Sequence, residues 1–372
     1  MKRITAGKKN LVFQIISLLM ISNLSVLAQS NSAHIAVDSL QRIARVTGSS
    51  IPGENLPDPN QTAVRSDLGG TDLGIAWDMG KGRTGYFFGD SYGRDFQPVK
   101  EGGPGKAGNW RSNVLGISSD QQLEDGITFD TLISRQIIYS PHITDGTDSH
   151  TAIPTAAVHA NGRDYVHYMD IRKWGRPGRW ETNYSGLYES RDGGMHWQSV
   201  KQVRFGALSN FSQAGYAKKD GYVYMAGTVP GRGGAIYLAR FKEKGILRQE
   251  SYEYWSGAAG WLKGQEAKAV RIIDAPAGEL SLIWHEGFKR WIIAYLDESR
   301  HGLVIRDAAE ASGPWSEPQM LARSAGYPGL YGSYIHPVSG KGNEFYFLMS
   351  MWYPYNVFLM KARLQQAASP ED

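Results

Sequence analysis

The amino-acid sequence predicts an all-β fold, a five-bladed β-propeller. Glycine accounts for 44 of the 372 residues and aromatic residues for 12%, a composition typical of many short strands joined by tight turns. Long segments with the 3.6-residue period of an amphipathic helix are missing. A hairpin followed by a third apolar strand recurs five times, about 60 residues apart, as expected for the blades of a propeller.

The N-terminal segment, residues 1–28, has the features of a secretory signal peptide. Four basic side chains lie within the first nine residues, an apolar core occupies residues 11–20, and a Val-Leu-Ala tripeptide ends at Ala28. The chain contains no cysteine, which excludes a lipoprotein signal. We therefore expect a secreted or periplasmic protein, with no membrane insertion after this peptide is removed.

The charge of the mature chain argues against a polyanionic partner. The whole chain carries a formal net charge of +4, and residues 1–28 contain four basic side chains and no acidic ones. The remaining chain is therefore close to neutral and lacks the basic surface on which nucleic-acid binding depends. No nucleic-acid partner is predicted.

The remaining elements follow the chain in order. Residues 29–55 are expected to be a linker with a candidate ring-closing strand at 43–46, residues 56–365 the propeller, and residues 366–372 a disordered tail. Each hairpin has turn-forming residues between two apolar strands. The hairpins are expected at 73–77 with 85–88, 156–159 with 165–169, 213–217 with 222–226, 280–284 with 291–296, and 332–336 with 345–350. The third strands are expected at 114–117, 186–188, 235–240, 303–306 and 357–361.

One rim of this propeller is expected to bind a ligand. Because neighbouring strands run antiparallel, the start of each first strand and the end of each second strand share one face. Polar and aromatic side chains gather in these connections, whereas the opposite rim carries mostly short turns. The candidate substrate-binding residues are Trp110, Arg111, Asn113, His150, Trp174, Asn183, Gln213 and Glu279.

Two aspartates frame the first hairpin. Asp72 precedes its first strand and Asp90 follows its second, and their mean position is 81, the centre of the turn. If the hairpin pairs symmetrically, the two residues are directly opposed, with Cβ atoms roughly 4.5–5.5 Å apart. Either one alone is explained as a turn carboxylate that caps backbone amides. Opposed on a polar rim, they are the candidate catalytic pair, and a one-residue slip in register would separate them.

Other motifs carry structure rather than chemistry. Residues 190–197, SRDGGMHW, match the Asp-box pattern of propellers, in which Asp caps turn amides and Trp packs into a blade; residues 312–315, SGPW, are similar in kind. Residues 103–108 satisfy G-x-G-x-x-G but contain proline and open no helix, which argues against a nucleotide site. The nine histidines lack metal-ligand spacing, and neither a metal nor another cofactor is predicted.

Several stretches together resemble one family of propellers. They are GTDLGIAWD, GYFFGDSYG, NWRSNVLG, the block from DYVHYMDIRKWG to SRDGGMHW, GYVYMAGTVPGRGGAIYLAR, GELSLIWHEGFKRWIIAYL and GPWSEP, and they run from about Gly70 to Arg363. This family was long catalogued as a domain of unknown function and is now associated with endo-D-arabinanases, which cut the D-arabinofuranan of mycobacterial arabinogalactan and lipoarabinomannan. The resemblance implies a five-bladed propeller, a retaining mechanism and an aspartate pair at Asp72 and Asp90.

The leading hypothesis is therefore a secreted, retaining, endo-acting glycoside hydrolase on a furanose polysaccharide, D-arabinan. Close like charges raise the pKa of one carboxyl and keep it protonated as the acid, but the sequence does not assign the two roles. Arg111, Asn113, His150 and Asn183 are expected to hold sugar hydroxyls and orient the pair. Two alternatives stay open, a non-catalytic glycan-binding propeller and a sialidase-type glycosidase suggested by the Asp box.

Overall fold

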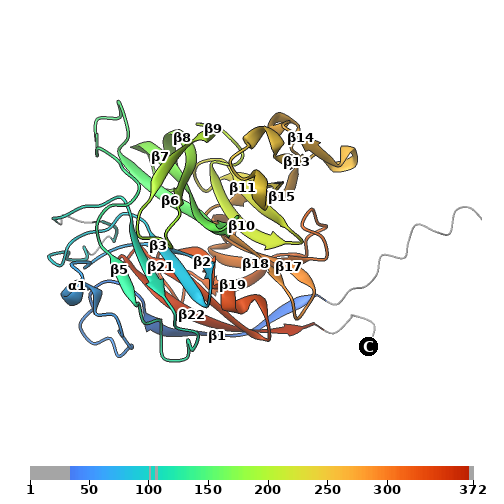
Figure 1. Cartoon of the computed structure of the whole chain (residues 1–372). Helices are drawn as coiled ribbons and strands as arrows, with labels where there is room; N and C mark the ends of the chain where they lie inside the picture. Colours follow the sequence, from blue (N-terminus) through green and yellow to red (C-terminus); the bar gives the residue numbers. More distant parts are fainter. Residues whose placement is uncertain (1–33, 100–101, 105–107, 368–372) are drawn as a thin grey trace, which may run out of the picture. The chain divides into compact units, whose positions relative to one another are not determined.

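A computed structural model describes residues 34–99, 102–104 and 108–367. The expected signal peptide and residues 368–372 of the expected tail lie outside these residues. The described chain is nearly all β, with five small antiparallel sheets arranged in a ring, which confirms the five-bladed β-propeller (Figure 1). No helix among the described residues is long and apolar enough to cross a membrane.

Blades 1, 2 and 4 are regular four-stranded sheets, each numbered from its inner strand outward. Blade 1 consists of β2 (Leu73–Gly80), β3 (Arg83–Phe88), β4 (Val114–Ser118) and β5 (Thr131–Ile133). Blade 2 consists of β6 (Thr151–Ala160), β7 (Arg163–Trp174), β8 (Trp180–Ser190) and β9 (Gln198–Gly206). Blade 4 consists of β16 (Leu280–His285), β17 (Arg290–Asp297), β18 (Gly302–Ala308) and β19 (Gln319–Arg323).

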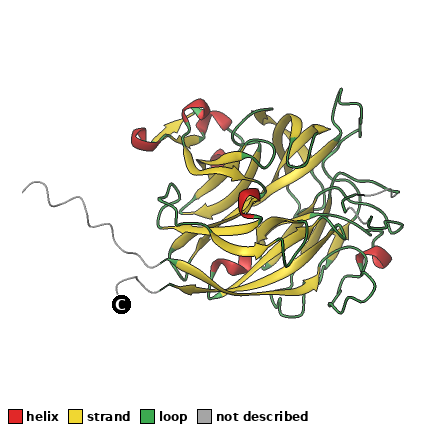
Figure 2. Ribbon diagram, turned by 180° about the vertical axis from the view of Figure 1, so that it is seen from behind, coloured by secondary structure: helices red, strands yellow, loops and turns green. Residues whose placement is uncertain are grey.

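Blade 3 is enlarged by an insertion. Its inner strands are β10 (Gln213–Lys219), β11 (Tyr222–Thr228) and β12 (Gly234–Lys242), and β12 pairs with both β13 (Glu253–Trp255) and β15 (Arg271–Ala277), while β14 (Trp261–Lys263) pairs with β13. Helices are confined to short turns, as Figure 2 shows. They are α1 (Thr62–Arg65) and the 3-10 helices η1 (Glu243–Gly245), η2 (Gln249–Ser251), η3 (Gly257–Ala259), η4 (Glu266–Lys268), η5 (Glu298–Arg300) and η6 (Pro337–Gly340).

Blade 5 closes the ring with strands from both ends of the chain. It consists of β20 (Leu330–Ile335), β21 (Glu344–Met351), β22 (Asn356–Gln366) and, as its outer strand, β1 (Ile35–Arg45). The expectation placed a linker at 29–55 with a closing strand at 43–46, whereas the strand is longer and begins at Ile35. The cause is a pairing with β22 that runs from Ile35 to Arg45 and that periodicity alone does not reveal. Gln366, assigned to the tail, is the last residue of β22.

The Asp box joins neighbouring blades. Asp192 caps its turn by accepting hydrogen bonds from the backbone N–H groups of Met195 (3.1 Å) and His196 (3.0 Å). The Trp197 ring from blade 2 packs against Trp77 (6.4 Å between ring centroids) and Phe87 (5.1 Å) of blade 1. This motif is therefore structural: it fastens blade 2 to blade 1 through aromatic packing.

The closing pair β1–β22 supports a direct test by disulfide trapping. Gln41 and Lys361 are register partners, and directly opposed strand residues have the Cα separation that a disulfide requires. In the Gln41→Cys/Lys361→Cys variant, we expect a disulfide to form under oxidising conditions and to raise Tm above that of the reduced protein, because the crosslink restricts the unfolded chain. Mass spectrometry and thermal melting measure both effects.

The control variant is Gln41→Cys/Arg363→Cys, in which the cysteines are diagonal neighbours on the same two strands. Diagonal positions lie roughly 7–8 Å apart, too far for an unstrained disulfide. Equal crosslinking in both variants, or none in either, would show that β1 does not close the ring in this register.

Candidate active site

The residues at, or one position from, the start of the five inner strands lie at one end of the ring. Each inner strand begins at the same face, so each blade presents one polar side chain there. We call this group the axial mouth; it comprises Asp72, Thr151, Gln213, Glu279 and Tyr331. Asp72 and Tyr331 are hydrogen-bonded to each other, and Thr151 is hydrogen-bonded to Asp90.

Asp72 is held from blade 5. Its Oδ2 accepts a hydrogen bond from the Tyr331 hydroxyl at 2.9 Å, whereas its buried Oδ1 has no hydrogen-bond partner among the described residues. The residue as a whole is half-buried. Burial, and then the charge of Asp90, raise the pKa of the Asp72 carboxyl to about 8, against the opposing effect of hydrogen bonds from Tyr331 and Tyr355. Near neutral pH this carboxyl is mostly protonated.

Asp90 has a different environment. Its Oδ1 accepts two hydrogen bonds, from the Thr151 hydroxyl at 2.6 Å and from the Trp110 indole N–H at 2.9 Å. Burial raises the pKa of the Asp90 carboxyl to about 6, with those two donors acting in the opposite direction. Asp90 is therefore mostly ionised at neutral pH while Asp72 keeps its proton. Two adjacent carboxyls with separated pKa values suit paired acid and base roles.

The predicted register of the hairpin is wrong by one residue at its open end. In the middle of the hairpin, Ile75 pairs with Phe87, as symmetry about position 81 requires. A bulge at Gly74 then shifts the pairing, so that the Gly89 N–H donates to the Asp72 carbonyl at 3.1 Å and Asp72 lies opposite Gly89. Gly74 has φ +102, and a Cβ there would lie 2.8 Å from a Leu348 methyl group of blade 5. The carboxylate of Asp72 instead lies over Gly89, where a Cβ would be only 2.3 Å from Oδ1.

The Glu279 carboxylate is not free, because it is paired with Arg232. Its Oε1 accepts hydrogen bonds from Arg232 at 2.8 and 3.1 Å, and its Oε2 accepts one at 3.2 Å. The Arg232 guanidinium also lies over the Tyr331 ring, 5.2 Å from its centroid. Burial acts to lower the pKa of Arg232, but the charge and hydrogen bonds of Glu279 outweigh it and hold the pKa above its usual value. Glu279 and Arg232 thus form a neutral pair beside Asp72.

Aromatic side chains extend outward from Asp90. The Trp110 ring contacts His150 at 5.4 Å, His150 contacts Trp174 at 6.5 Å, and Trp174 contacts Trp180 at 5.6 Å between centroids. Trp174 is 41% exposed, at the end of the long β7–β8 hairpin. Burial lowers the pKa of His150 and so favours its neutral ring. The predicted residues Trp110, His150 and Trp174 therefore lie together and lead away from the carboxyl pair.

On the other side of the mouth, Trp352 is 43% exposed and its ring lies 6.1 Å from that of Tyr331. Asp72 is connected to this tryptophan through Tyr331, just as Asp90 is connected to Trp174 through Trp110 and His150. Each carboxyl therefore has its own path of rings to an exposed tryptophan.

Three predicted substrate-binding residues use their polar groups in hydrogen bonds to other parts of the protein. Arg111 is buried, and its guanidinium donates to the carbonyls of Ser134 (2.8 Å) and Asp67 (2.9 Å). Asn113 is fully buried, with its amide donating to two backbone carbonyls and accepting from the N–H groups of residues 137 and 138. Gln213 is buried and donates to the Gly231 carbonyl. These side chains support the loops around the mouth.

Asn183 is half-buried and donates to Asp170 Oδ1 at 2.8 Å. Among the described residues, this hydrogen bond joins Asn183 to Asp170 and not to the carboxyl pair. Burial raises the pKa of Asp170.

The sequence does not predict Thr151 as a site residue, because threonine is common in strands and its presence there indicates no function. Tyr331 and Arg232 stand on the predicted rim, but their link to Asp72 depends on contacts among three blades. Position relative to the inner strand is the signal that finds Thr151 and Tyr331, since both lie within the first two residues of such a strand.

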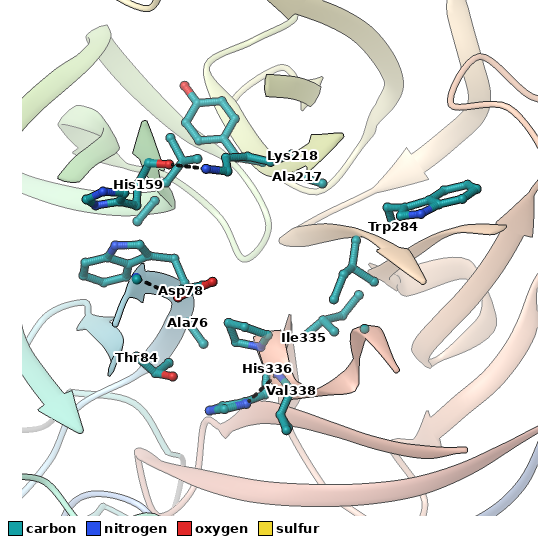
Figure 3. A pocket seen from close by; sticks show the side chains of 18 of the residues that line it. Ala76, Asp78, Thr84, His159, Ala217, Lys218, Trp284, Ile335, His336 and Val338 are labelled. Carbon is teal, nitrogen blue, oxygen red and sulfur yellow. Dashed lines mark hydrogen bonds between the residues drawn. The ribbon is translucent and has the colours of Figure 1, made fainter. Parts of the chain in front are cut away.

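A separate cavity of about 570 Å³ lies at the other end of the ring (Figure 3). It is lined by residues from the hairpin-turn side, among them Ala76, His159, Lys218, Trp284 and His336. Neither aspartate of the pair lines it. Among the described residues, no group of three or more His, Cys, Asp or Glu side chains is placed to hold a metal ion, here or at the mouth.

Comparison with known proteins gives the family. Residues 58–361 match the family described as a domain of unknown function, DUF4185. The chain belongs to DUF4185. A curated relative, Notoamide biosynthesis cluster protein J of Aspergillus sp. (strain MF297-2), is 29% identical over 316 residues, covering 78% of this chain and 82% of that protein.

Two solved structures share the fold of this DUF4185 chain. A protein from Bacteroides ovatus ATCC 8483 aligns with a TM-score of 0.54 at 12% identity, covering 80% of this chain and 86% of its own. Zg3597, a family 117 glycoside hydrolase of the marine bacterium Zobellia galactanivorans, aligns with a TM-score of 0.50 at 8% identity, covering 92% and 93%. At these identities the likeness concerns the propeller fold.

The raised pKa of Asp72 predicts a pH-dependent stability. A carboxyl with a folded pKa of about 8 and an ordinary value of 3.8 binds its proton more tightly in the folded state. The free energy of unfolding therefore decreases as pH rises between these two values. Asp72→Asn removes this loss. We expect the variant to be more stable than the wild type by about 1–3 kcal/mol above pH 8, with the difference vanishing toward pH 4.

Thermal melting from pH 4 to 9 measures this difference. Asp38→Asn, on the exposed part of β1, is the matched control and should show no such trend. A stability difference between Asp72→Asn and the wild type that does not change with pH would contradict the assigned environment of Asp72.

Proposed function

We propose that this protein is a secreted, retaining, endo-acting glycoside hydrolase that cleaves a furanose polysaccharide, the D-arabinan of mycobacterial arabinogalactan and lipoarabinomannan. The observation that carries the proposal is the pair Asp72 and Asp90 at the mouth of a propeller, with Asp72 held by Tyr331 and Asp90 by Thr151 and Trp110. The predicted signal peptide supports secretion. The resemblance in sequence supports the arabinan substrate.

The two environments suggest a role for each carboxyl. Asp90, ionised and steadied by Thr151 and Trp110 on one oxygen, is the nucleophile. Its Oδ2 forms a bond to the anomeric carbon while the glycosidic C–O bond breaks, and Asp72 gives its proton to the leaving oxygen. In the second step Asp72 takes a proton from water, the water oxygen bonds to the anomeric carbon, and the ester bond to Asp90 breaks. Both carboxyls return to their starting states.

The closeness of the pair favours retention. Retaining enzymes have carboxyl groups about 5–5.5 Å apart, whereas inverting enzymes need a wider gap for a water molecule. Asp72 precedes β2 and Asp90 follows β3 at the open end of one hairpin. The bulge at Gly74 sets them one residue out of direct opposition, and the charge of Asp90 still acts on Asp72. Trp174 and Trp352, exposed on either side, provide flat apolar faces on which sugar rings of an extended chain can stack. This supports binding of a polymer across the mouth.

The charges around the mouth suit a neutral glycan better than an acidic one. A sialidase-type site needs cationic side chains free to bind a substrate carboxylate. Here Arg232 is neutralised by Glu279, and Arg111 is bonded to backbone carbonyls. The non-catalytic alternative is also less well supported, because simple glycan binding gives no reason to bury two adjacent carboxyls at a cost in stability.

Substituting either aspartate tests the proposal. Asp72→Asn and Asp90→Asn should each reduce hydrolysis of purified arabinogalactan by about 10³-fold or more, because one loses the proton donor and the other the nucleophile. Product oligosaccharides are measured by chromatography. Asp78→Asn, at the opposite end of the same hairpin, is the control and should cleave normally.

The outcomes separate the candidate functions. Wild-type rates in both aspartate variants would show that the pair is not catalytic. A wild-type protein that binds arabinan and releases no oligosaccharide would favour the glycan-binding propeller.

A further inference from the structure

We propose that Tyr331 is the positioning residue for Asp72 and that Arg232 and Glu279 hold Tyr331 in place. This inference rests on the proposed function, in which Asp72 is the acid/base. In this proposal, three residues from three blades together fix the carboxyl group of Asp72. None of them is required to touch the substrate.

The first step is the geometry between Tyr331 and Asp72. The tyrosine hydroxyl donates to Asp72 Oδ2 at 2.9 Å. Since Oδ2 accepts this hydrogen bond, the carboxyl proton belongs on Oδ1, the atom without a partner among the described residues. An acid that must deliver a proton to a glycosidic oxygen needs a fixed orientation, and the Tyr331 bond sets the rotation of the Asp72 carboxyl group.

The backbone is shaped to make this contact. In β20 the pairing with β21 shifts between Tyr331 and Tyr334, and Gly332 within the bulge has φ +65. In β2, Leu73 has φ +68 and its N–H donates to Ser350 Oγ of blade 5 at 2.7 Å. Positive φ at a leucine is unfavourable and persists only where neighbouring structure imposes it. Two irregular strands thus bring Asp72 and Tyr331 together across the junction of blades 1 and 5.

The second step is the support of Tyr331 by Arg232. The guanidinium lies 5.2 Å from the Tyr331 ring centroid and is fixed by the fork of hydrogen bonds to Glu279. A second carboxylate, Glu298, lies 3.6 Å from the remaining Arg232 nitrogen. Arginine over an aromatic ring and bidentate to a carboxylate is held in two directions at once. The position of Tyr331, which is 3% exposed, follows from this arrangement.

The electrostatic effects of Tyr331 and Glu279 on Asp72 have opposite signs. The Tyr331 hydrogen bond lowers the pKa of Asp72, whereas the charge of Glu279 raises it. Removing the hydroxyl should therefore raise that pKa, and neutralising Glu279 should lower it. The titratable and charged groups around Asp72 are Asp90, Tyr92, Glu279 with its partner Arg232, Tyr331, Tyr334 and Tyr355.

The test compares Tyr331→Phe and Glu279→Gln in pH–rate profiles on arabinan. Tyr331→Phe keeps the ring under Arg232 and loses only the hydroxyl. We expect kcat to fall about 10–100-fold with little change in KM, because the acid loses its fixed orientation while substrate binding is intact. The basic limb of the profile should move to higher pH in Tyr331→Phe and to lower pH in Glu279→Gln.

Tyr346→Phe is the matched control. This tyrosine is also buried in blade 5, but its hydroxyl is directed to Glu124 and Glu344. Its profile should coincide with that of the wild type. A purely structural role for Tyr331 would lower Tm without moving the basic limb, and unchanged kcat and limbs in both variants would overturn the proposal.

A second readout does not depend on turnover. In protein labelled with ¹³C at the aspartate carboxyls, the Asp72 resonance is assigned from Asp72→Asn and titrated in each variant. Opposite shifts of its titration in Tyr331→Phe and Glu279→Gln support the arrangement, and parallel or absent shifts overturn it. If these shifts occur but the wild type cleaves no furanose polysaccharide, the proposed function fails, and with it the catalytic task of Tyr331.

Discussion

The carboxyl groups of Asp72 and Asp90 interact electrostatically, with only neutral donors bonded to them, and the site is arranged around this constraint. Those donors are the Tyr331 hydroxyl, the Trp110 indole and the Thr151 hydroxyl. Two adjacent charges in such surroundings are costly, so one carboxyl keeps its proton. Burial and the charge of Asp90 raise the pKa of Asp72 above that of Asp90, so Asp72 is the carboxyl that keeps the proton. The same difference in pKa suggests which carboxyl attacks and which donates a proton.

The propeller supplies the stiffness that this arrangement needs. Inner strands from all five blades begin at the axial mouth, and their bases are fixed by sheets that close through β1 and β22. Side chains on such a frame keep their geometry better than side chains on isolated loops. The loops contribute the rest: the β7–β8 hairpin carries Trp174, and the turn after β21 carries Trp352. Asn113 and Arg111 serve this frame by satisfying buried backbone carbonyls.

Much of this could be predicted from the sequence, because alternation and turn chemistry are local. The five hairpins, the decorated rim and the two aspartates of the first hairpin all follow from short patterns. The one-residue offset at Gly74 could not be foreseen, since it arises from the approach of Leu348 in another blade. The Asn113 amide was predicted to bind sugar hydroxyls because its actual partners, the carbonyls of residues 138 and 152, are distant in sequence. The roles of Tyr331 and Arg232 depend on contacts between blades 3, 4 and 5, which local sequence patterns do not predict.

The central claim is that Asp72 and Asp90 act as a double-displacement pair, and the anomeric configuration of the first product tests it most directly. Proton NMR of an arabinofuranosyl oligosaccharide during early hydrolysis resolves the newly formed anomer before mutarotation. The claim predicts that the product first appears with the configuration of the bond that was cut. A first product of inverted configuration would contradict it, because inversion requires a single displacement by water.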